Sequence, residues 1–114
     1  MNRKIASRLL DAINALDEVE AFTSGLSESD FETQRGTQLI VERLLITVGE
    51  AVGRAEELDN EIAKRIPEIR DIVGTRNRLV HGYWEVSAKT LWEVIVEKGP
   101  QLRQTLQELL EEYG

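Results

Sequence analysis

The sequence contains no cysteine, which excludes disulfide bonds, zinc sites built on thiolates and catalysis by a cysteine nucleophile. Proline occurs only at Pro67 and Pro100, and the eight glycines are scattered. This shortage of turn-forming residues favours long helices over a turn-rich sheet protein. A long apolar run is also absent from the start of the chain, where charged residues interrupt the apolar positions. We therefore expect neither a signal peptide nor a membrane span, and we expect a cytoplasmic protein.

The composition is that of one folded domain. A chain of 114 residues can form one core but is too short for two, so we expect a single domain over residues 1–114. Hydrophobic residues make up 41% and charged residues 31%, which is too apolar for a disordered chain.

Apolar residues recur at spacings of three and four along most of the chain, which predicts amphipathic helices. The expected helices run from near the start to about Gly25, then over 28–35, 37–58, 61–66, from about 67 to 81, and over 87–113 with an interruption at 98–100. Short connections between such helices predict an all-α antiparallel helical bundle.

Helix-end signals divide the chain further. Ser27 resembles an N-cap, and Gly36 is a possible break after the short helix that follows it. Gly82 can adopt positive φ, so a helix is expected to end near His81. The helix over 37–58 is apolar on more than one side, so it is either central in the bundle or part of a subunit interface.

Charge is unevenly distributed. The net charge of −7 argues against broad electrostatic attraction to nucleic acid. Segment 64–78, however, has five cations against two acids, a local charge of +3 that leaves about −10 for the remainder. A polyanion is therefore expected to bind at this segment, unless its cations are merely solvated helix-surface residues.

The only histidine of the chain, His81, lies within the segment that is richest in candidate functional groups. Arg76, Asn77 and Arg78 precede it, and Tyr83 follows it. Histidine exchanges protons near neutral pH, and an arginine binds phosphate through paired donors. This combination suits chemistry on a phosphodiester.

Helical geometry leaves the arrangement of these groups open. Asn77 and His81 are four residues apart and share a helix face, whereas Arg76 and His81 are five apart and differ by about 140° in direction. The arginine can reach around the helix, an irregular helix end can close the gap, or two copies of the segment can converge in a dimer. A simpler alternative is a structural histidine that bonds a terminal carbonyl beside surface cations.

An RNA substrate would require no metal and no cofactor. The ribose 2′-hydroxyl is an internal nucleophile, so the protein must move protons and stabilise charge. His81 can act as general base on this hydroxyl or as general acid on the leaving 5′-oxygen. Arg76 can stabilise the more highly charged transition state. A dimer would supply two histidines for the two proton transfers.

Several ordered blocks resemble the HepT-like toxins, a branch of the HEPN superfamily with the signature Arg-x4-His-x-Tyr. They are the opening amphipathic helix, GEA at 49–51, IPEI at 66–69, GTRNRLVHGYW at 74–84, a helix containing Trp92 and a proline at position 100. This similarity extends over nearly the full chain.

The resemblance implies an all-α homodimer in which the motifs meet in a cleft. Arg76 and His81 match the family's ribonuclease residues, and Asn77 matches the polar position after the motif arginine. Glu50 lies on the helix that faces the site in relatives. Tyr83 matches the tyrosine that a partner can modify with AMP.

Family members form toxin–antitoxin pairs in which a minimal nucleotidyltransferase is the antitoxin. The resemblance therefore implies a metal-independent ribonuclease toxin that the partner silences by AMP addition. Arg78 is a further candidate for RNA binding. The alternative function is a nucleotide-binding or AMP-acceptor partner of the nucleotidyltransferase that does not cleave RNA.

Overall fold

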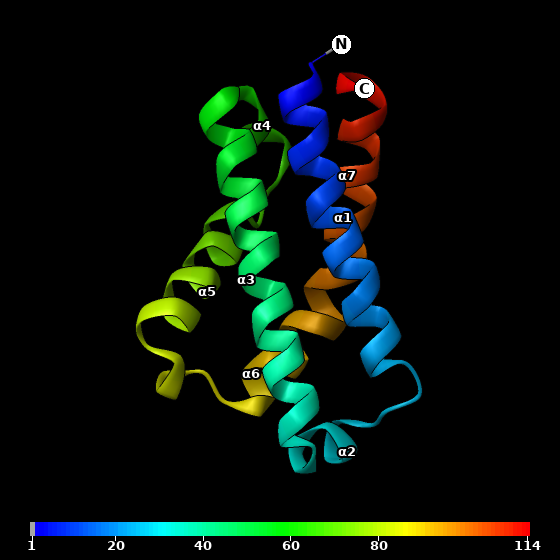
Figure 1. Ribbon diagram of the computed structural model, residues 1–114, viewed down its shortest axis with the longest axis vertical. Coiled ribbons are helices and arrows are strands. Elements are labelled where there is room, and N and C mark those ends of the chain that lie inside the picture. Colours follow the sequence, from blue (N-terminus) through cyan, green and yellow to red (C-terminus); the bar gives the residue numbers. More distant parts are fainter. Residues whose placement is uncertain (1) are drawn as a thin grey trace.

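The computed structural model describes residues 2–114, except the side chain of Tyr83, and every regular element in that part is helical (Figure 1). The predicted all-α fold is therefore confirmed. The α-helices are α1 (Arg3–Thr23), α2 (Glu28–Thr33), α3 (Arg35–Leu58), α4 (Glu61–Arg65), α5 (Ile69–His81), α6 (Ala88–Glu93) and α7 (Gly99–Tyr113). A 3₁₀ turn, η1 (Tyr83–Glu85), precedes α6, and a π-helical segment, η2 (Val94–Lys98), precedes α7. Within the described residues, no helix is long and apolar enough to cross a membrane.

The long helices run side by side with α3 in the centre (Figure 1). Helix α1 packs along one side of α3, α5 packs along another, and α7 lies against α1. Both ends of the chain lie at the same end of the molecule, where the Asn2 amide donates to the Tyr113 carbonyl over 2.9 Å. Of the two positions predicted for the second long helix, the central one is therefore confirmed.

The core consists of two clusters of buried side chains. The first cluster joins α1, α3 and α7 with the turn around α4; its largest fully buried members are Ile5, Leu9, Val48, Val52, Ile62, Ile66, Leu106 and Leu109. The second cluster lies where α2 and α6 cover the other end of α3; its buried members are Val19, Phe31, Val41, Leu45, Leu79, Val86 and Leu91. Phe31 is fully buried, with its ring 5.4 Å from that of Trp92. Burial of these apolar surfaces is the main stabilising force of the bundle.

The connection between α1 and α3 confirms one predicted signal and corrects another. The Ser27 hydroxyl accepts from the Asp30 amide over 3.1 Å, and the Asp30 carboxylate accepts from the Ser27 amide over 3.0 Å, so Ser27 caps α2 in a capping box. Gly36, predicted as a break, instead lies in the first turn of α3. The break falls at Gln34, which has a non-helical φ of −108° and ψ of 81°. Gln38 fixes this corner by donating to two carbonyl groups in the last turn of α2.

The other helix boundaries lie close to the predictions. Helix α5 ends at His81 as predicted, but Gly82 has a φ of −146° and not the positive φ on which that prediction rested. The helix begins at Ile69, two residues after Pro67. Ile66 has extended backbone, which is typical of a residue before proline. In the last segment, the predicted interruption at 98–100 is a change of helix type: the π-helical segment η2 ends at Lys98, and α7 begins directly at Gly99.

Candidate functional site

Helices α3 and α5 make a close contact at Gly49 and Arg76. A Cβ atom built on Gly49 would overlap the Cβ of Arg76, would lie 2.8 Å from its Cγ, and would lie 3.3 Å from the Ile72 carbonyl oxygen. Each of these separations is shorter than ordinary van der Waals contact. Only glycine therefore allows the stem of Arg76 to rest on the backbone of α3.

Arg76 contacts two of the other predicted site residues, Glu50 across the contact between α3 and α5 and its own neighbour Asn77. Its Nη2 donates to Glu50 Oε1 over 3.1 Å, and its Nη1 donates to Asn77 Oδ1 over 3.1 Å. The Arg76 side chain is 28% exposed and that of Glu50 is 48% exposed. The guanidinium is thus oriented by two oxygen acceptors but remains accessible from solvent.

One donor of Arg76 lies buried and unused. Its Nε has no hydrogen-bond partner among the described residues. A buried donor without a partner carries a desolvation penalty. Because this atom is buried, an anion that arrives from solvent would bind to the Nη groups, which also donate to Glu50 and Asn77.

His81 lies in the last turn of α5 and is exposed. The Gly82 amide donates a hydrogen bond to the Arg78 carbonyl oxygen over 2.6 Å, so a backbone group already satisfies this carbonyl at the end of α5. Within the described residues, the imidazole makes no hydrogen bond and no ion pair. The alternative of a histidine that bonds a terminal carbonyl is therefore not what the structure contains.

Arg76 and His81 point in different directions. Helix α5 is regular from Ile69 to His81, so five residues separate the two side chains by about 140° around its axis. Arg76 packs on α3, whereas His81 faces solvent. A single chain brings together Glu50, Arg76 and Asn77. His81 lies one turn beyond Asn77 on the same face of α5 and, within the described residues, forms no hydrogen bond to any of the three. Arg78 is exposed on the same helix, and the Tyr83 side chain lies outside the described part.

Acids neutralise part of the positive charge of the basic segment 64–78. Three of its five cations form ion pairs: Lys64 with Glu61 at 3.2 Å, Arg65 with Glu112 at 2.8 Å, and Arg76 with Glu50 at 3.1 Å. The hydrogen bond from Arg65 lowers the pKa of the Glu112 carboxyl. The local positive charge counted from the sequence is thus partly offset, since two of these acids come from other helices, although Lys98 of η2 also pairs with Asp71 of the segment at 2.9 Å.

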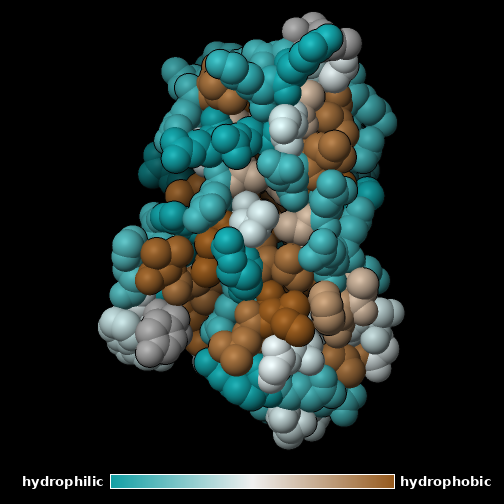
Figure 2. All heavy atoms as spheres, in the orientation of Figure 1, coloured by the Kyte–Doolittle hydropathy of each residue, from teal (hydrophilic) through white to brown (hydrophobic). Residues whose placement is uncertain are grey.

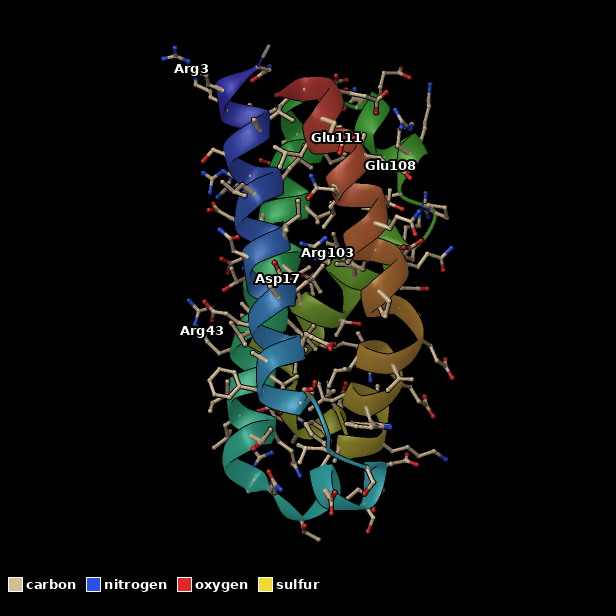
Figure 3. The ribbon with its side chains drawn as sticks, turned by 90° about the vertical axis from the view of Figure 1, so that its right-hand side faces the viewer. Arg3, Asp17, Arg43, Arg103, Glu108 and Glu111 are labelled. Carbon is tan, nitrogen blue, oxygen red and sulfur yellow. The ribbon has the colours of Figure 1, made fainter. Side chains whose placement is uncertain are left out.

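Sequence reasoning missed a cavity of about 300 Å³ between the two core clusters. Aliphatic side chains from α1, α3, α5, η2 and α7 form most of its wall; they include Leu16, Val19, Leu45, Val48, Ile72, Val94, Ile95 and Leu102. On its rim, Arg103 Nε donates to Asp17 Oδ1 over 2.6 Å, and Figure 3 shows the two side chains facing each other between α1 and α7. This hydrogen bond lowers the pKa of the Asp17 carboxyl. None of the predicted site residues lines the cavity. Its wall consists of residues from five separate elements, so no local sequence pattern indicates it.

Among the described residues, no group of three or more histidine, aspartate or glutamate side chains gathers where it could hold a metal ion. The candidate site therefore consists of an oriented arginine, its acidic and amide partners, and an exposed histidine on the same helix.

Comparison with known proteins places this chain in a family. A model of the family described as ribonuclease HepT-like matches residues 12–109. A protein of Thermococcus cleftensis named "Probable ribonuclease HepT" is 31% identical over 111 residues, which cover 96% of this chain and 98% of that protein.

Two further relatives have names that give them as candidate RNases. One, from Methanocaldococcus jannaschii, is 25% identical over 96% of this chain and 90% of its own length. The other, from Caldanaerobacter subterraneus, is 30% identical over 76% of this chain and 77% of its own length. No solved structure matches the chain significantly. The family match covers most of the sequence, including both helices that form the Gly49–Arg76 contact, and the chain therefore belongs to the HepT-like ribonuclease family.

Proposed function

We propose that this chain is a metal-independent endoribonuclease that acts in the cytoplasm as the toxin of a toxin–antitoxin pair. The observation that carries the proposal concerns two residues of α5. Two acceptors orient the Arg76 guanidinium, and the exposed His81 lies on the same helix as Arg76. Membership of a ribonuclease family supports RNA as the substrate.

The cleavage step follows from the chemistry of RNA. His81 removes the proton of a ribose 2′-hydroxyl, and the 2′-oxygen attacks the adjacent phosphorus. The bond from phosphorus to the 5′-oxygen breaks, and this leaving oxygen takes a proton from a protonated imidazole. The products are a 2′,3′-cyclic phosphate and a free 5′-hydroxyl. Arg76 binds the phosphate and stabilises the extra negative charge of the transition state.

A homodimer would bring the separated groups together. Arg76 and His81 diverge on α5, so the histidine of one protomer can face the arginine of its partner across a cleft. The face over α3 and the end of α5 supports such pairing, since Leu39, Ile40 and Val80 are between 38% and 51% exposed. Figure 2 shows apolar side chains gathered on the lower half of this face. Exposed apolar surface of this kind is typical of an interaction site.

The remaining predicted residues are assigned supporting roles. Asn77 and Arg78 contact RNA, and Glu50 holds the Arg76 guanidinium in its orientation. Tyr83 is the acceptor at which a minimal nucleotidyltransferase adds AMP. A bulky anion next to His81 would occupy the phosphate site and repel RNA, which would silence the toxin.

The second candidate function is an AMP-acceptor partner that does not cleave RNA. The observation in its favour is electrostatic: the chain has a net charge of −7, and three cations of segment 64–78 are paired with acids. Such a surface binds a polyanion weakly.

An RNA cleavage assay in EDTA separates the two functions. Purified wild-type protein, with intact mass confirming an unmodified Tyr83, should cleave RNA, whereas His81→Ala and Arg76→Ala should not. Lys89→Ala, which removes an exposed cation on α6, is the matched control and should retain activity. Cleavage by His81→Ala would contradict the mechanism, and an inactive, unmodified wild type would favour the acceptor function.

A further inference from the structure

A second concentration of positive charge lies at the end of the molecule where the described chain begins. The start of α1 and the end of α3 lie side by side there (Figure 1) and form a shallow hollow of about 630 Å³. We refer to it as the basic hollow; its lining residues are Arg3, Lys4, Ser7, Arg8, Arg54, Glu57 and Leu58. Four cations against one acid give it a charge of +3, in a chain whose total is −7.

Most of this charge is uncompensated. Arg54 is paired with Glu57 at 3.1 Å, but within the described residues Arg3, Lys4 and Arg8 form no ion pair. All three are exposed. Figure 3 shows Arg3 projecting from α1 on the side away from Glu108 and Glu111 of α7. The basic hollow therefore keeps its positive potential, in contrast to segment 64–78.

The position of these cations does not favour folding. Arg3, Lys4 and Arg8 lie in the first turns of α1, and the first turn contains no acidic residue. Unpaired amide groups already make a helix start positive, so cations there are less favourable than acids. The arrangement thus needs an explanation other than the stability of α1, and an anionic ligand supplies one.

We infer that the basic hollow is a second RNA-binding surface, which holds the phosphate backbone of the substrate at a distance from the cleavage site. This inference rests on the proposed ribonuclease function. The guanidinium groups of Arg3, Arg8 and Arg54 suit phosphate oxygens. None of the lining residues is aromatic, so the contacts are to phosphates rather than to stacked bases, and they are independent of base sequence.

The size of the molecule sets the RNA length that reaches both surfaces. The longest extent of the protein is 44 Å. At about 3.4 Å per nucleotide along one strand, about a dozen nucleotides span this length. A strand of twenty nucleotides is therefore long enough to contact both the basic hollow and α5, whereas one of four nucleotides covers only about 14 Å.

The test compares two double variants with the same change in charge. Arg3→Gln/Arg8→Gln removes two cations of the basic hollow, and Arg43→Gln/Lys89→Gln removes two exposed cations on α3 and α6, outside the hollow. Both pairs are made in the His81→Ala background, so that the RNA is bound but not cut. Fluorescence anisotropy then gives the affinity for a twenty-nucleotide RNA over a range of salt concentrations.

We expect the Arg3→Gln/Arg8→Gln pair to weaken binding and to reduce the slope of log affinity against log salt by about 1.4, which corresponds to two lost phosphate contacts on a single strand. The control pair should leave the slope unchanged. Equal effects of both pairs, or no effect of either, would overturn the inference. If RNA binding is unchanged but a complex with a co-expressed nucleotidyltransferase is lost, the hollow belongs to a protein partner instead.

Failure of the proposed function gives a different result. Cleavage of a four-nucleotide RNA by the wild-type chain needs only the α5 site, so its absence would count against the ribonuclease mechanism and not against the basic hollow. Conversely, cleavage of this short RNA should be the same with Arg3→Gln/Arg8→Gln in the otherwise wild-type chain.

Discussion

Replacing Gly49 with alanine should force α3 and α5 apart at the contact that holds Arg76. The new methyl group would overlap the Cβ of Arg76 and would come within 3.3 Å of the Ile72 carbonyl oxygen. These atoms belong to the backbone of α5 or lie next to it, so no side-chain rotation relieves the clash. The helix itself must move, and the Arg76 guanidinium must move away from Glu50 with it.

The size of the effect can be estimated from two opposing terms. Overpacking of a tight core costs about 1–3 kcal/mol, and a clash with backbone belongs in the upper part of that range. Alanine is better than glycine in a helix interior by about 1 kcal/mol. Gly49→Ala should therefore lower the free energy of unfolding by about 1–2 kcal/mol.

Gly53, one turn further along α3, is the matched control. A Cβ atom there would meet nothing within 4 Å, and its φ is not positive. Gly53→Ala should therefore raise the free energy of unfolding by up to about 1 kcal/mol through helix propensity alone. Urea unfolding of both variants measures the difference, and RNA cleavage should fall only in Gly49→Ala. Equal stabilisation by the two substitutions would refute the close contact.

Three further predictions concern the cavity, an ion pair on its rim and a helix cap. Val48→Ile adds one methylene at the wall of the 300 Å³ cavity and should raise the free energy of unfolding by up to about 0.8 kcal/mol; a loss of stability in urea would contradict the cavity. Arg103 lowers the pKa of Asp17, so this pair stabilises the fold above the ordinary carboxyl pKa of about 4, and the stabilisation disappears as the pH falls through the lowered pKa. Asp17→Asn should therefore cost under about 1 kcal/mol at pH 7 and make the loss of stability on acidification smaller, as urea unfolding at pH 7 and pH 2 would reveal. Ser27→Ala removes the hydroxyl of the capping box and should cost about 1 kcal/mol; an unchanged urea midpoint would mean that Ser27 does not stabilise α2.

Local sequence signals predicted most of the fold because helices are specified locally. The three-and-four spacing identified the long helices, and Ser27 was identified as a cap from residue type alone. The misplaced break at Gly36 has a non-local cause. Gln38 donates to carbonyl groups six and seven residues earlier, and this fixes the corner at Gln34 in a way that propensity does not reveal.

The candidate site was predictable in its residues but not in its contacts. The ordered motif identified Arg76, Asn77 and His81, whereas the bond from Arg76 to Glu50 joins residues 26 positions apart and depends on the Gly49 contact. Counting charges along the sequence gave segment 64–78 a net positive charge, because the count could not include acids from other helices. Glu112 of α7, for example, pairs with Arg65 of the segment.

Counting charges along the sequence did not identify the basic hollow, for the opposite reason. Its cations come from the first residues of α1 and from Arg54 of α3, and only the packing of the two helices brings them together. The cavity wall is assembled in the same way from five elements.

The pairing of α1 with α7 has a consequence for synthesis on the ribosome. Ile5 and Leu9 of α1 are buried in the same cluster as Leu106 and Leu109 of α7, about a hundred residues later in the chain. At roughly 5–20 residues per second, α1 waits about 5–20 seconds for the helix that covers it. During this time the nascent protein exposes part of an apolar helix face, so the first cluster closes only after α7 has been synthesised. Early release of the chain, before α7 is made, would leave that face uncovered and prone to aggregation.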